Sequence, residues 1–336
     1  MMATARLGGV CVLALALLAA CSKPAPQDSQ TLTFSILSAE NQASMQPLWQ
    51  PLLDDMHAET GLKIKPFFAT NYASLIEAMR FKQVQLGWYS ALPALEAVQR
   101  AHGEVIGRVL DAGGASAVYR SVLIVRKGSG ITLDKVLKCG KRYSFGIGDP
   151  NSTSGTLAPM AYVFAPRGIQ PADCFKTVRS ASHQANVFAV AQGLVDVATN
   201  NTVGLVFAAR ENPAIAAKLQ VIWTSPDLPE SAIVVRKDLD PAVKEKVRAF
   251  FLSYGSAPGA EGDRQRQVLA KLTYGGFEPV DAHYLDPIRR MKAAQTLSEA
   301  KAGHDKGKIV AAQKAFDALP PERPTQAQTT STPAGG

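Results

Sequence analysis

Short runs of β-forming apolar residues alternate with longer amphipathic segments from Thr31 almost to the end of the chain. In the short runs, apolar and polar residues often alternate at every second position, which is typical of half-buried strands. The longer segments repeat apolar residues every three or four positions, which predicts helices packed on a core. This pattern predicts about nine strands, at 31–37, 62–69, 85–89, 119–126, 143–146, 195–199, 203–209, 219–224 and 232–236. It predicts helices at 45–60, 75–82, 93–102, 133–137, 156–164, 186–192, 241–254 and 263–270.

Strands that alternate with helices along a chain are typical of an α/β protein with mostly parallel sheets flanked by helices. About nine strands over roughly 260 residues exceed one sheet, because single cores stop growing near this size. We therefore expect two lobes, with crossings at the β-branched runs 119–126 and 232–236. The expected organisation is lobe 1 over 31–120, lobe 2 over 121–231, a return to lobe 1 over 232–285, C-terminal helices over 286–319 and a disordered tail over 320–336.

The N-terminus differs from the rest of the chain. Arg6 precedes an apolar run that is too short to span a bilayer as a helix, and this predicts a signal peptide over 1–20 and export. The Leu-Ala-Ala-Cys sequence ending at Cys21 resembles the lipobox of bacterial lipoproteins. The resemblance implies a lipid on Cys21, a flexible tether over 21–30 and a location in the periplasm or cell envelope, anchored to a membrane. An ordinary secretory signal with a chance cysteine is the alternative.

Composition and charge narrow the class of protein. The 336 residues are 46% hydrophobic and 19% charged, which is enough apolar material for a sizeable core. The formal net charge of +8 falls to +7 when Arg6 leaves with the signal peptide. This modest excess of positive charge is compatible with an anionic ligand or an anionic membrane surface, and it specifies neither. No run of Lys and Arg is interleaved with aromatic residues, which argues against nucleic-acid binding.

The sequence holds no H-E-x-x-H, G-x-S-x-G, Walker A or C-x-x-C motif. Its five histidines lack the paired spacing of a metal site. The glycines of 146–151 begin like a dinucleotide fingerprint, but the third glycine is missing and a proline interrupts the turn. We therefore expect no cofactor, no metal and no enzymatic activity.

Two cysteines, Cys139 and Cys174, lie within the expected second lobe. An exported protein meets oxidising conditions, and this spacing matches no zinc or redox motif. We expect a disulfide between them, with two reduced buried thiols as the alternative.

The segment 148–156, Gly-Asp-Pro-Asn-Ser-Thr-Ser-Gly-Thr, carries the clearest chemistry. A predicted strand leads into it and a helical pattern follows it, so Ser152, Thr153 and Ser154 are expected at a helix N-terminus. Their hydroxyls, the free backbone amides and the positive end of the helix dipole would together hold a tetrahedral oxyanion. Plain helix capping, which needs only one Ser or Thr, is the alternative.

Several further segments belong with this one: Phe-Phe-Ala at 67–69, Tyr72, Met-Arg-Phe at 79–81, Trp-Tyr at 88–89, Ser-Val-Leu-Ile-Val at 121–125 and Asp-Val-Ala-Thr-Asn-Asn at 196–201. With Asp-Pro-Asn-Ser-Thr-Ser-Gly at 149–155, they resemble the substrate-binding proteins of phosphonate ABC transporters, from about Leu32 to Tyr254. The resemblance implies a two-lobed type II periplasmic-binding-protein fold that closes over a phosphonate and delivers it to a membrane permease. It further implies that the phosphonate is held by Ser152, Thr153, Ser154, Tyr72, Tyr119 and His183, the last as a donor that depends on pH.

Two positions depart from the family pattern and bear on the ligand. In members that resemble the 2-aminoethylphosphonate binder, two carboxylates neutralise the ligand's ammonium group, whereas Val203 and Ser231 occupy those positions here. An ammonium group buried beside Val203 would lack its ion pair, at a cost of several kcal/mol. We therefore expect the ligand to be phosphite or a short alkylphosphonate. Glu230 could substitute if its loop shifts by one residue, so 2-aminoethylphosphonate is the alternative ligand.

Other classes of protein fit less well. An exported hydrolase acting on phosphorus oxyanions needs a nucleophile, base or metal constellation, and none is visible.

Strand alternation places Arg120 on the face opposite Tyr119, so we leave Arg120 out of the site. The polar C-terminal helices could pair with a second copy, which would make the protein a homodimer.

Overall fold

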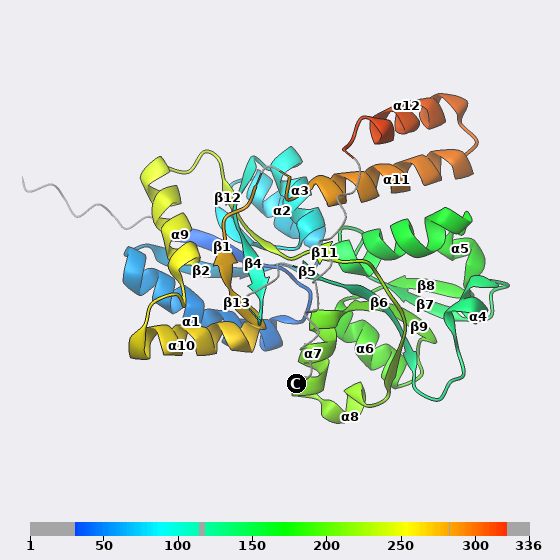
Figure 1. The fold of residues 1–336 in the computed structure, drawn as a ribbon, viewed down its shortest axis with the longest axis horizontal. Coiled ribbons are helices and arrows are strands. Elements are labelled where there is room, and N and C mark those ends of the chain that lie inside the picture. Colours follow the sequence, from blue (N-terminus) through cyan, green and yellow to red (C-terminus); the bar gives the residue numbers. More distant parts are fainter. Residues whose placement is uncertain (1–30, 114–117, 282, 321–336) are drawn as a thin grey trace, which may run out of the picture.

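Two mixed sheets, each flanked by helices, form the two lobes of the protein (Figure 1). The structure, a computed structural model, describes residues 31–113, 118–281 and 283–320. The predicted signal peptide, Cys21 with its predicted lipid, the predicted tether and the tail beyond Pro320 lie outside these residues. None of the helices in the described ranges has the length and apolar character needed to cross a membrane.

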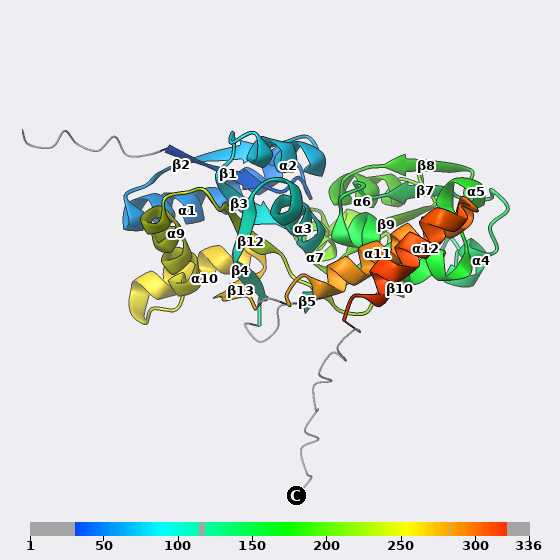
Figure 2. The same cartoon turned by 90° about the horizontal axis from the view of Figure 1, so that it is seen from above.

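Lobe 1 contains a six-stranded sheet in the order β13-β4-β12-β3-β1-β2. Figure 2 shows α1, α9 and α10 on one side of this sheet and α2 and α3 on the other. The strands are β1 (Thr31–Ile36), β2 (Lys63–Phe68), β3 (Leu86–Tyr89), β4 (Gly103–Asp111), β12 (Ala232–Arg236) and β13 (Tyr274–Glu278). The helices are α1 (Gln42–Thr60), α2 (Tyr72–Arg80), α3 (Ala91–Arg100), α9 (Pro241–Ser253) and α10 (Gly259–Leu272).

Lobe 2 contains a five-stranded sheet in the order β10-β6-β9-β7-β8. A separate two-stranded ribbon of β5 (Val118–Tyr119) and β11 (Leu228–Pro229) accompanies the chain where it passes between the lobes. The lobe 2 strands are β6 (Ser121–Arg126), β7 (Ser144–Ile147), β8 (Thr177–Ser180), β9 (Val197–Asn201) and β10 (Leu219–Thr224). Its helices are α4 (Leu133–Leu137), α5 (Pro171–Cys174), α6 (His183–Ala191), α7 (Thr202–Glu211) and α8 (Pro213–Ala216), with a continuous helical segment over 153–167.

The two-lobed α/β fold is confirmed, but the expectation of mostly parallel sheets is wrong. Four strand pairs are parallel and six are antiparallel. The reason lies in the crossings. β6 and β12 enter each sheet from the other lobe, so they run against the neighbouring strands, β9 and β3, that end at that same edge.

Several elements differ from the pattern-based prediction. The run 203–209, counted as a strand, is part of helix α7, because Asn201 caps the N-terminus by accepting a hydrogen bond from the amide of Gly204. β4, β8 and β13 were not predicted. All three lack a clean apolar alternation; β8 is exposed throughout, and β4 and β13 contain glycines.

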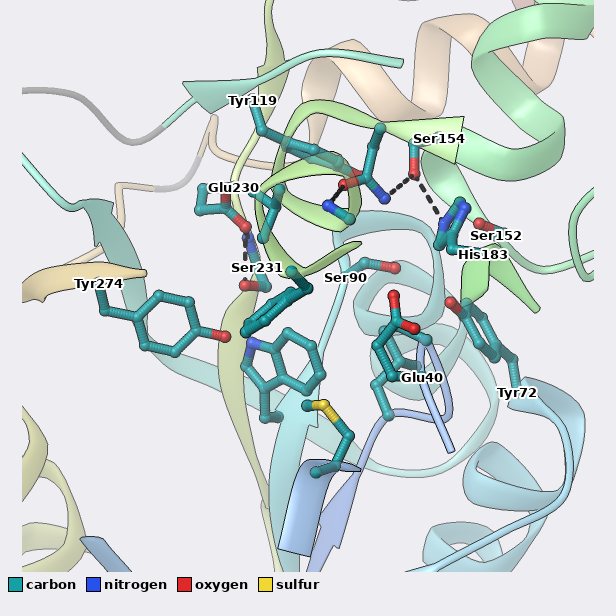
Figure 3. Close-up of a pocket in the computed structure, with 18 residues that line it drawn as sticks. Glu40, Tyr72, Ser90, Tyr119, Ser152, Ser154, His183, Glu230, Ser231 and Tyr274 are labelled. Carbon is teal, nitrogen blue, oxygen red and sulfur yellow. Dashed lines mark hydrogen bonds between the residues drawn. The ribbon is translucent and has the colours of Figure 1, made fainter. Parts of the chain in front are cut away.

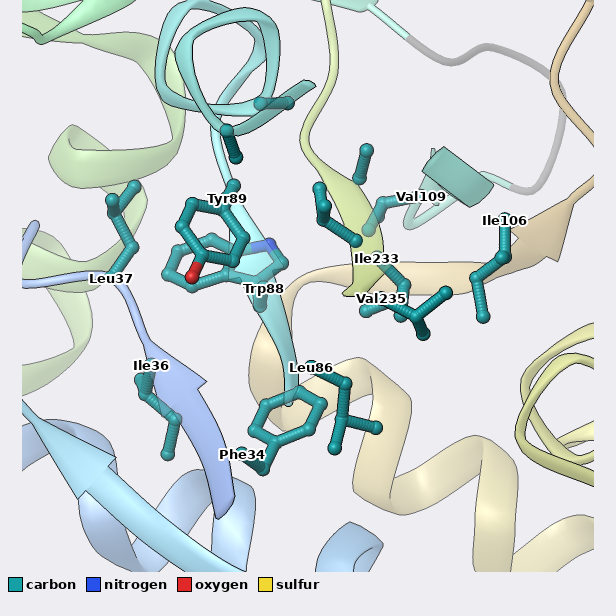
Figure 4. Close-up of a cluster of buried hydrophobic side chains, with 14 of the residues drawn as sticks. Phe34, Ile36, Leu37, Leu86, Trp88, Tyr89, Ile106, Val109, Ile233 and Val235 are labelled. Atoms are coloured by element: carbon teal, nitrogen blue, oxygen red, sulfur yellow. The ribbon is translucent and has the colours of Figure 1, made fainter. Parts of the chain in front are cut away.

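The core of lobe 1 is built around aromatic side chains on β1 and β3, which Figure 4 shows, and on α1. The ring of Trp49 lies 5.4 Å from the rings of both Phe34 and Trp88, centre to centre. In lobe 2, β6 is buried on both faces, since Leu123 and Val125 belong to one apolar cluster and Val122 and Ile124 to the other. Both sheets are thereby fixed as rigid platforms for the residues at their edges.

A C-terminal helical hairpin, α11 (Asp286–Ala302) and α12 (Lys306–Asp317), completes the fold. α11 contacts α3 of lobe 1 and the helical segment 153–167 of lobe 2, so it bridges the two lobes (Figure 2). Lys292 of α11 forms an ion pair with the buried carboxylate of Glu96 on α3.

Candidate functional site

A pocket of about 50 Å³ lies where the edges of the two sheets face each other (Figure 3). Residues of lobe 1, of lobe 2 and of the crossing segments all contribute to its wall. The lining residues are Leu37, Ala39, Glu40, Met45, Tyr72, Trp88, Ser90, Tyr119, Ser152, Ser154, His183, Asn201, Val203, Gly204, Phe207, Glu230, Ser231 and Tyr274.

The segment 148–156 forms one wall through a close approach of two glycines. Gly148 donates its amide hydrogen to the carbonyl of Gly155, and a Cβ added at Gly155 would lie 2.8 Å from both the Gly148 Cα and the Ser152 Oγ. Only glycine permits this contact, because real Cβ atoms are not found at such distances. The turn between them is held by Asp149, whose carboxylate accepts hydrogen bonds from the amides of Asn151 and Tyr72.

Helical structure begins at Thr153, three residues earlier than predicted, and its first turn is π-helical (Thr153–Leu157). Ser152 is the N-cap, and its buried hydroxyl accepts a hydrogen bond from the amide of Gly155. Ser154 Oγ lies 3.2 Å from Nε2 of His183 and also accepts a hydrogen bond from the Asn201 side chain. π-helical turns concentrate at functional sites.

Thr153 is fully buried but is not among the residues that line the pocket. Its Oγ1 accepts a hydrogen bond from the amide of Leu92 at 2.8 Å and lies 3.3 Å from the hydroxyl of Ser90. Ser90 is the N-cap residue of α3 but makes no side-chain capping bond itself. Thr153 of lobe 2 therefore caps a helix of lobe 1.

Tyr72, Tyr119 and His183 all line the pocket, as the family resemblance implies. Burial raises the pKa of both tyrosines well above the ordinary value, so both hydroxyls keep their hydrogens. Burial lowers the pKa of His183 to about 4. His183 is thus a neutral imidazole near pH 7, because the buried ring has no carboxylate partner to hold a second proton, and a pH-dependent donor at this position would change its charge only under acidic conditions.

The three selectivity positions also reach the pocket. Val203 lies in the first turn of α7, and Ser231 precedes the crossing strand β12. Glu230 is buried and turned back onto its own loop, where its Oε1 accepts hydrogen bonds from both the amide and the hydroxyl of Ser231. Burial, opposed by these two bonds, raises the pKa of Glu230.

Among the pocket residues that sequence reasoning missed, four carry a carboxyl, hydroxyl or amide group: Glu40, Ser90, Asn201 and Tyr274. The first three follow or end the strands β1, β3 and β9, whose carboxyl ends meet at the pocket, and this is the signal that could have revealed them. Tyr274 begins β13, which was not predicted.

The pocket wall carries no positively charged Lys or Arg side chain among the described residues. The described part of the chain also holds no cluster suited to a metal ion. Arg120, excluded on the basis of strand alternation, lies outside the pocket in an ion pair with Asp227. Neutral hydroxyl, amide and imidazole groups therefore supply the polar surface.

Direct contacts hold the two lobes together around the pocket. At its mouth, the Gln184 side chain on α6 bonds to Asn41, Ser44 and Glu211, which ties α1 to α6 and α7. Deeper inside, the amide of Tyr72 bonds to the Asp149 carboxylate across the same gap. The structure therefore has a closed arrangement of its lobes.

Away from the pocket, Cys139 and Cys174 are joined by a disulfide with a Cα–Cα distance of 4.4 Å. It links the end of α4 to α5 beneath the apolar cluster around Phe145 and Phe175. The disulfide supports lobe 2 and takes no part in the pocket.

Two lobes closed over a small pocket with a few polar groups define the class of solute-binding proteins. Comparison with known proteins narrows this class. A family described as "ABC transporter, phosphonate, periplasmic substrate-binding protein" matches residues 34–285. The phosphonates-binding periplasmic protein of Escherichia coli K12 is 41% identical over 279 residues, which are 83% of this chain and 80% of that protein. The chain belongs to this family of periplasmic substrate-binding proteins, whose members are binding components of ABC transporters and not enzymes.

Solved structures agree. A binding protein of a phosphonate ABC transporter from Pseudomonas aeruginosa superimposes with a TM-score of 0.82 at 38% identity, covering 86% of this chain and 96% of that one. A Prochlorococcus marinus protein in complex with methylphosphonate has a TM-score of 0.69 at 18% identity, covering 79% and 97% of the two chains. The second likeness concerns the fold alone.

Proposed function

We propose that this protein captures phosphite or a short alkylphosphonate in the pocket between its lobes and delivers it to the membrane permease of an ABC importer. One observation carries the proposal: the wall combines several neutral hydrogen-bond donors with no Lys or Arg. Hydroxyls, amides and a helix N-terminus bind a phosphorus oxyanion without a full countercharge.

The absence of an amine in the ligand is supported by three other residues of the pocket. Val203 and Phe207 supply apolar surface, and the Glu230 carboxyl already accepts hydrogen bonds from Ser231. An ammonium group would be buried without an ion pair, which costs several kcal/mol.

The alternative ligand, 2-aminoethylphosphonate, is favoured by a different observation. Two carboxyl groups, Glu40 and Glu230, line the pocket, and an ionised carboxylate would attract the ammonium group. Calorimetric titration of ligand-free protein with phosphite, methylphosphonate, 2-aminoethylphosphonate and orthophosphate decides between the ligands.

We expect methylphosphonate or phosphite to bind at least tenfold more tightly than the aminated ligand, which is about 1.4 kcal/mol. The double variant Val203→Glu, Ser231→Asp should reverse this preference, and Arg120→Ala, outside the pocket, should leave it unchanged. Tighter binding of 2-aminoethylphosphonate by the unchanged protein would contradict the amine-free proposal. If none of the four ligands binds, the proposed ligand class is wrong.

We further propose that a lipid on Cys21 anchors the protein to a membrane of the cell envelope. The lipobox-like sequence supports this. Cys21→Ser should release the protein from the membrane fraction, and intact mass spectrometry should lose the mass of the lipid. Pairing of two copies through α11 and α12 stays a prediction that sedimentation of the purified protein tests.

A further inference from the structure

The carboxyl group of Glu40 differs from other buried carboxyls of the protein. Glu40 is only 8% exposed, yet its side chain has no hydrogen bond and no ion pair with any of the described residues. Glu96 is equally buried but is paired with Lys292 and Arg100, and Glu230 is bonded to Ser231. A largely buried carboxyl that lines a pocket and has no partner in the protein is free to bond to a ligand there.

The fold holds Glu40 in place at the pocket. It follows the end of β1 and precedes Asn41, which caps α1 by accepting a hydrogen bond from the amide of Ser44. Figure 3 shows the carboxyl directed into the pocket, beside the hydroxyls of Tyr72 and Ser90, on the side where Ser152 and His183 lie. The carboxyl is therefore on the same side of the pocket as Ser152 and His183.

The charges around Glu40 disfavour an ionised carboxylate. Glu211 of α7, Asp149 beside Tyr72, and Glu230 are the acids near the pocket, and the lining residues include no Lys or Arg. His183 is neutral, and the pKa values of Tyr72 and Tyr119 are raised by burial. Burial, helped by the charge of Glu211, raises the pKa of Glu40 to about 8. At neutral pH most of the protein thus carries Glu40 as a carboxylic acid.

We propose that Glu40 is a ligand-binding residue that donates the proton of its carboxylic acid to an oxygen of the bound phosphonate. This inference rests on the proposed function, since it names a group of the same site. A protonated acid adds a donor to a pocket that lacks cations, whereas a carboxylate would repel the doubly charged ligand. One proton lies between the two oxygens in the complex, so ligand binding keeps Glu40 protonated. Above pH 8 the free protein has lost this proton, and binding must take one up.

The test is calorimetric titration of methylphosphonate between pH 7 and 10. Wild-type affinity should fall by up to tenfold per pH unit above pH 8, with uptake of one proton measured in two buffers of different ionisation enthalpy. Glu40→Gln keeps a hydrogen-bond donor that does not titrate, so its affinity should change little over this range. Glu40→Ala should bind about tenfold or more weakly at pH 7. Glu211→Gln should retain the alkaline loss but move it to lower pH, because the charge of Glu211 helps to raise the pKa of Glu40.

Three outcomes would overturn the inference. An alkaline loss in Glu40→Gln as steep as in wild type would assign the titration to another group. A loss of 2-aminoethylphosphonate binding in Glu40→Gln with methylphosphonate binding unchanged would make Glu40 an ionised partner of an ammonium group. A wild-type protein that binds no phosphonate at any pH would overturn the proposed function and this inference with it, and the first two outcomes would leave phosphonate binding intact.

Discussion

Nε2 of His183 lies 3.2 Å from the hydroxyl oxygen of Ser154, which joins the first turn of α6 to the first turn of the helical segment 153–167. The side-chain amide of Asn201, at the end of β9, donates to the same oxygen. Three elements of lobe 2 thus orient one hydroxyl at the pocket wall. This arrangement explains why Ser154 and His183, far apart in the sequence, act as one unit.

Replacing Ser154 with alanine removes that oriented hydroxyl. We expect Ser154→Ala to weaken methylphosphonate binding about 10- to 100-fold, since a hydrogen bond to a charged group contributes about 1.5–3 kcal/mol. Ser253→Ala is a matched control, because its hydroxyl bonds to a carbonyl of α9 in lobe 1, outside the pocket. Calorimetric titration of both variants checks the expectation, and equal affinities would remove Ser154 from the site.

The neutral state of His183 predicts a pH dependence of folding. Its pKa is about 4 in the folded protein, below the ordinary value of 6.5, so the unfolded chain binds more protons between these values. The stability of the fold is therefore complete above pH 6.5 and falls as the pH drops toward 4, by about 3 kcal/mol from this residue.

Urea unfolding of ligand-free wild type and of His183→Asn at pH 7.5 and 4.5 measures this contribution. The variant should lose clearly less stability than wild type between the two pH values. Equal losses would mean that His183 titrates normally in the folded state.

Thr153 should affect ligand binding through closure of the lobes. Thr153→Val keeps the shape of the side chain but leaves the amide of Leu92 without its acceptor when the lobes close. The closed form should be destabilised by about 1–3 kcal/mol, and the apparent affinity should fall accordingly. Small-angle scattering of the variant should show a larger fraction of open molecules at subsaturating ligand. An unchanged affinity would show that this contact does not contribute to closure.

The sequence predicts the overall plan of the molecule and part of its site. The residues of the 149–155 segment could be found because turn chemistry and helix capping are local. Tyr274 could not, because its position depends on the pairing of β13 with β4. The strand directions also escaped prediction, since periodicity reports burial and not which edge of a sheet a strand enters. Periodicity alone also does not separate a short buried helix from a strand. The segment 203–209 was therefore predicted as a strand, although its capping residue Asn201 was visible in the sequence.

We propose that the segment around Ser152 and Ser154 holds the phosphorus oxyanion between the lobes, and a crystal structure of the protein with methylphosphonate would test this. We expect the phosphorus atom beside Ser152, Ser154 and Tyr72, with oxygens in hydrogen-bond distance of both serine hydroxyls and the methyl group facing Val203 and Phe207. A phosphorus atom outside this pocket, or one whose methyl group faces the serines, would contradict it.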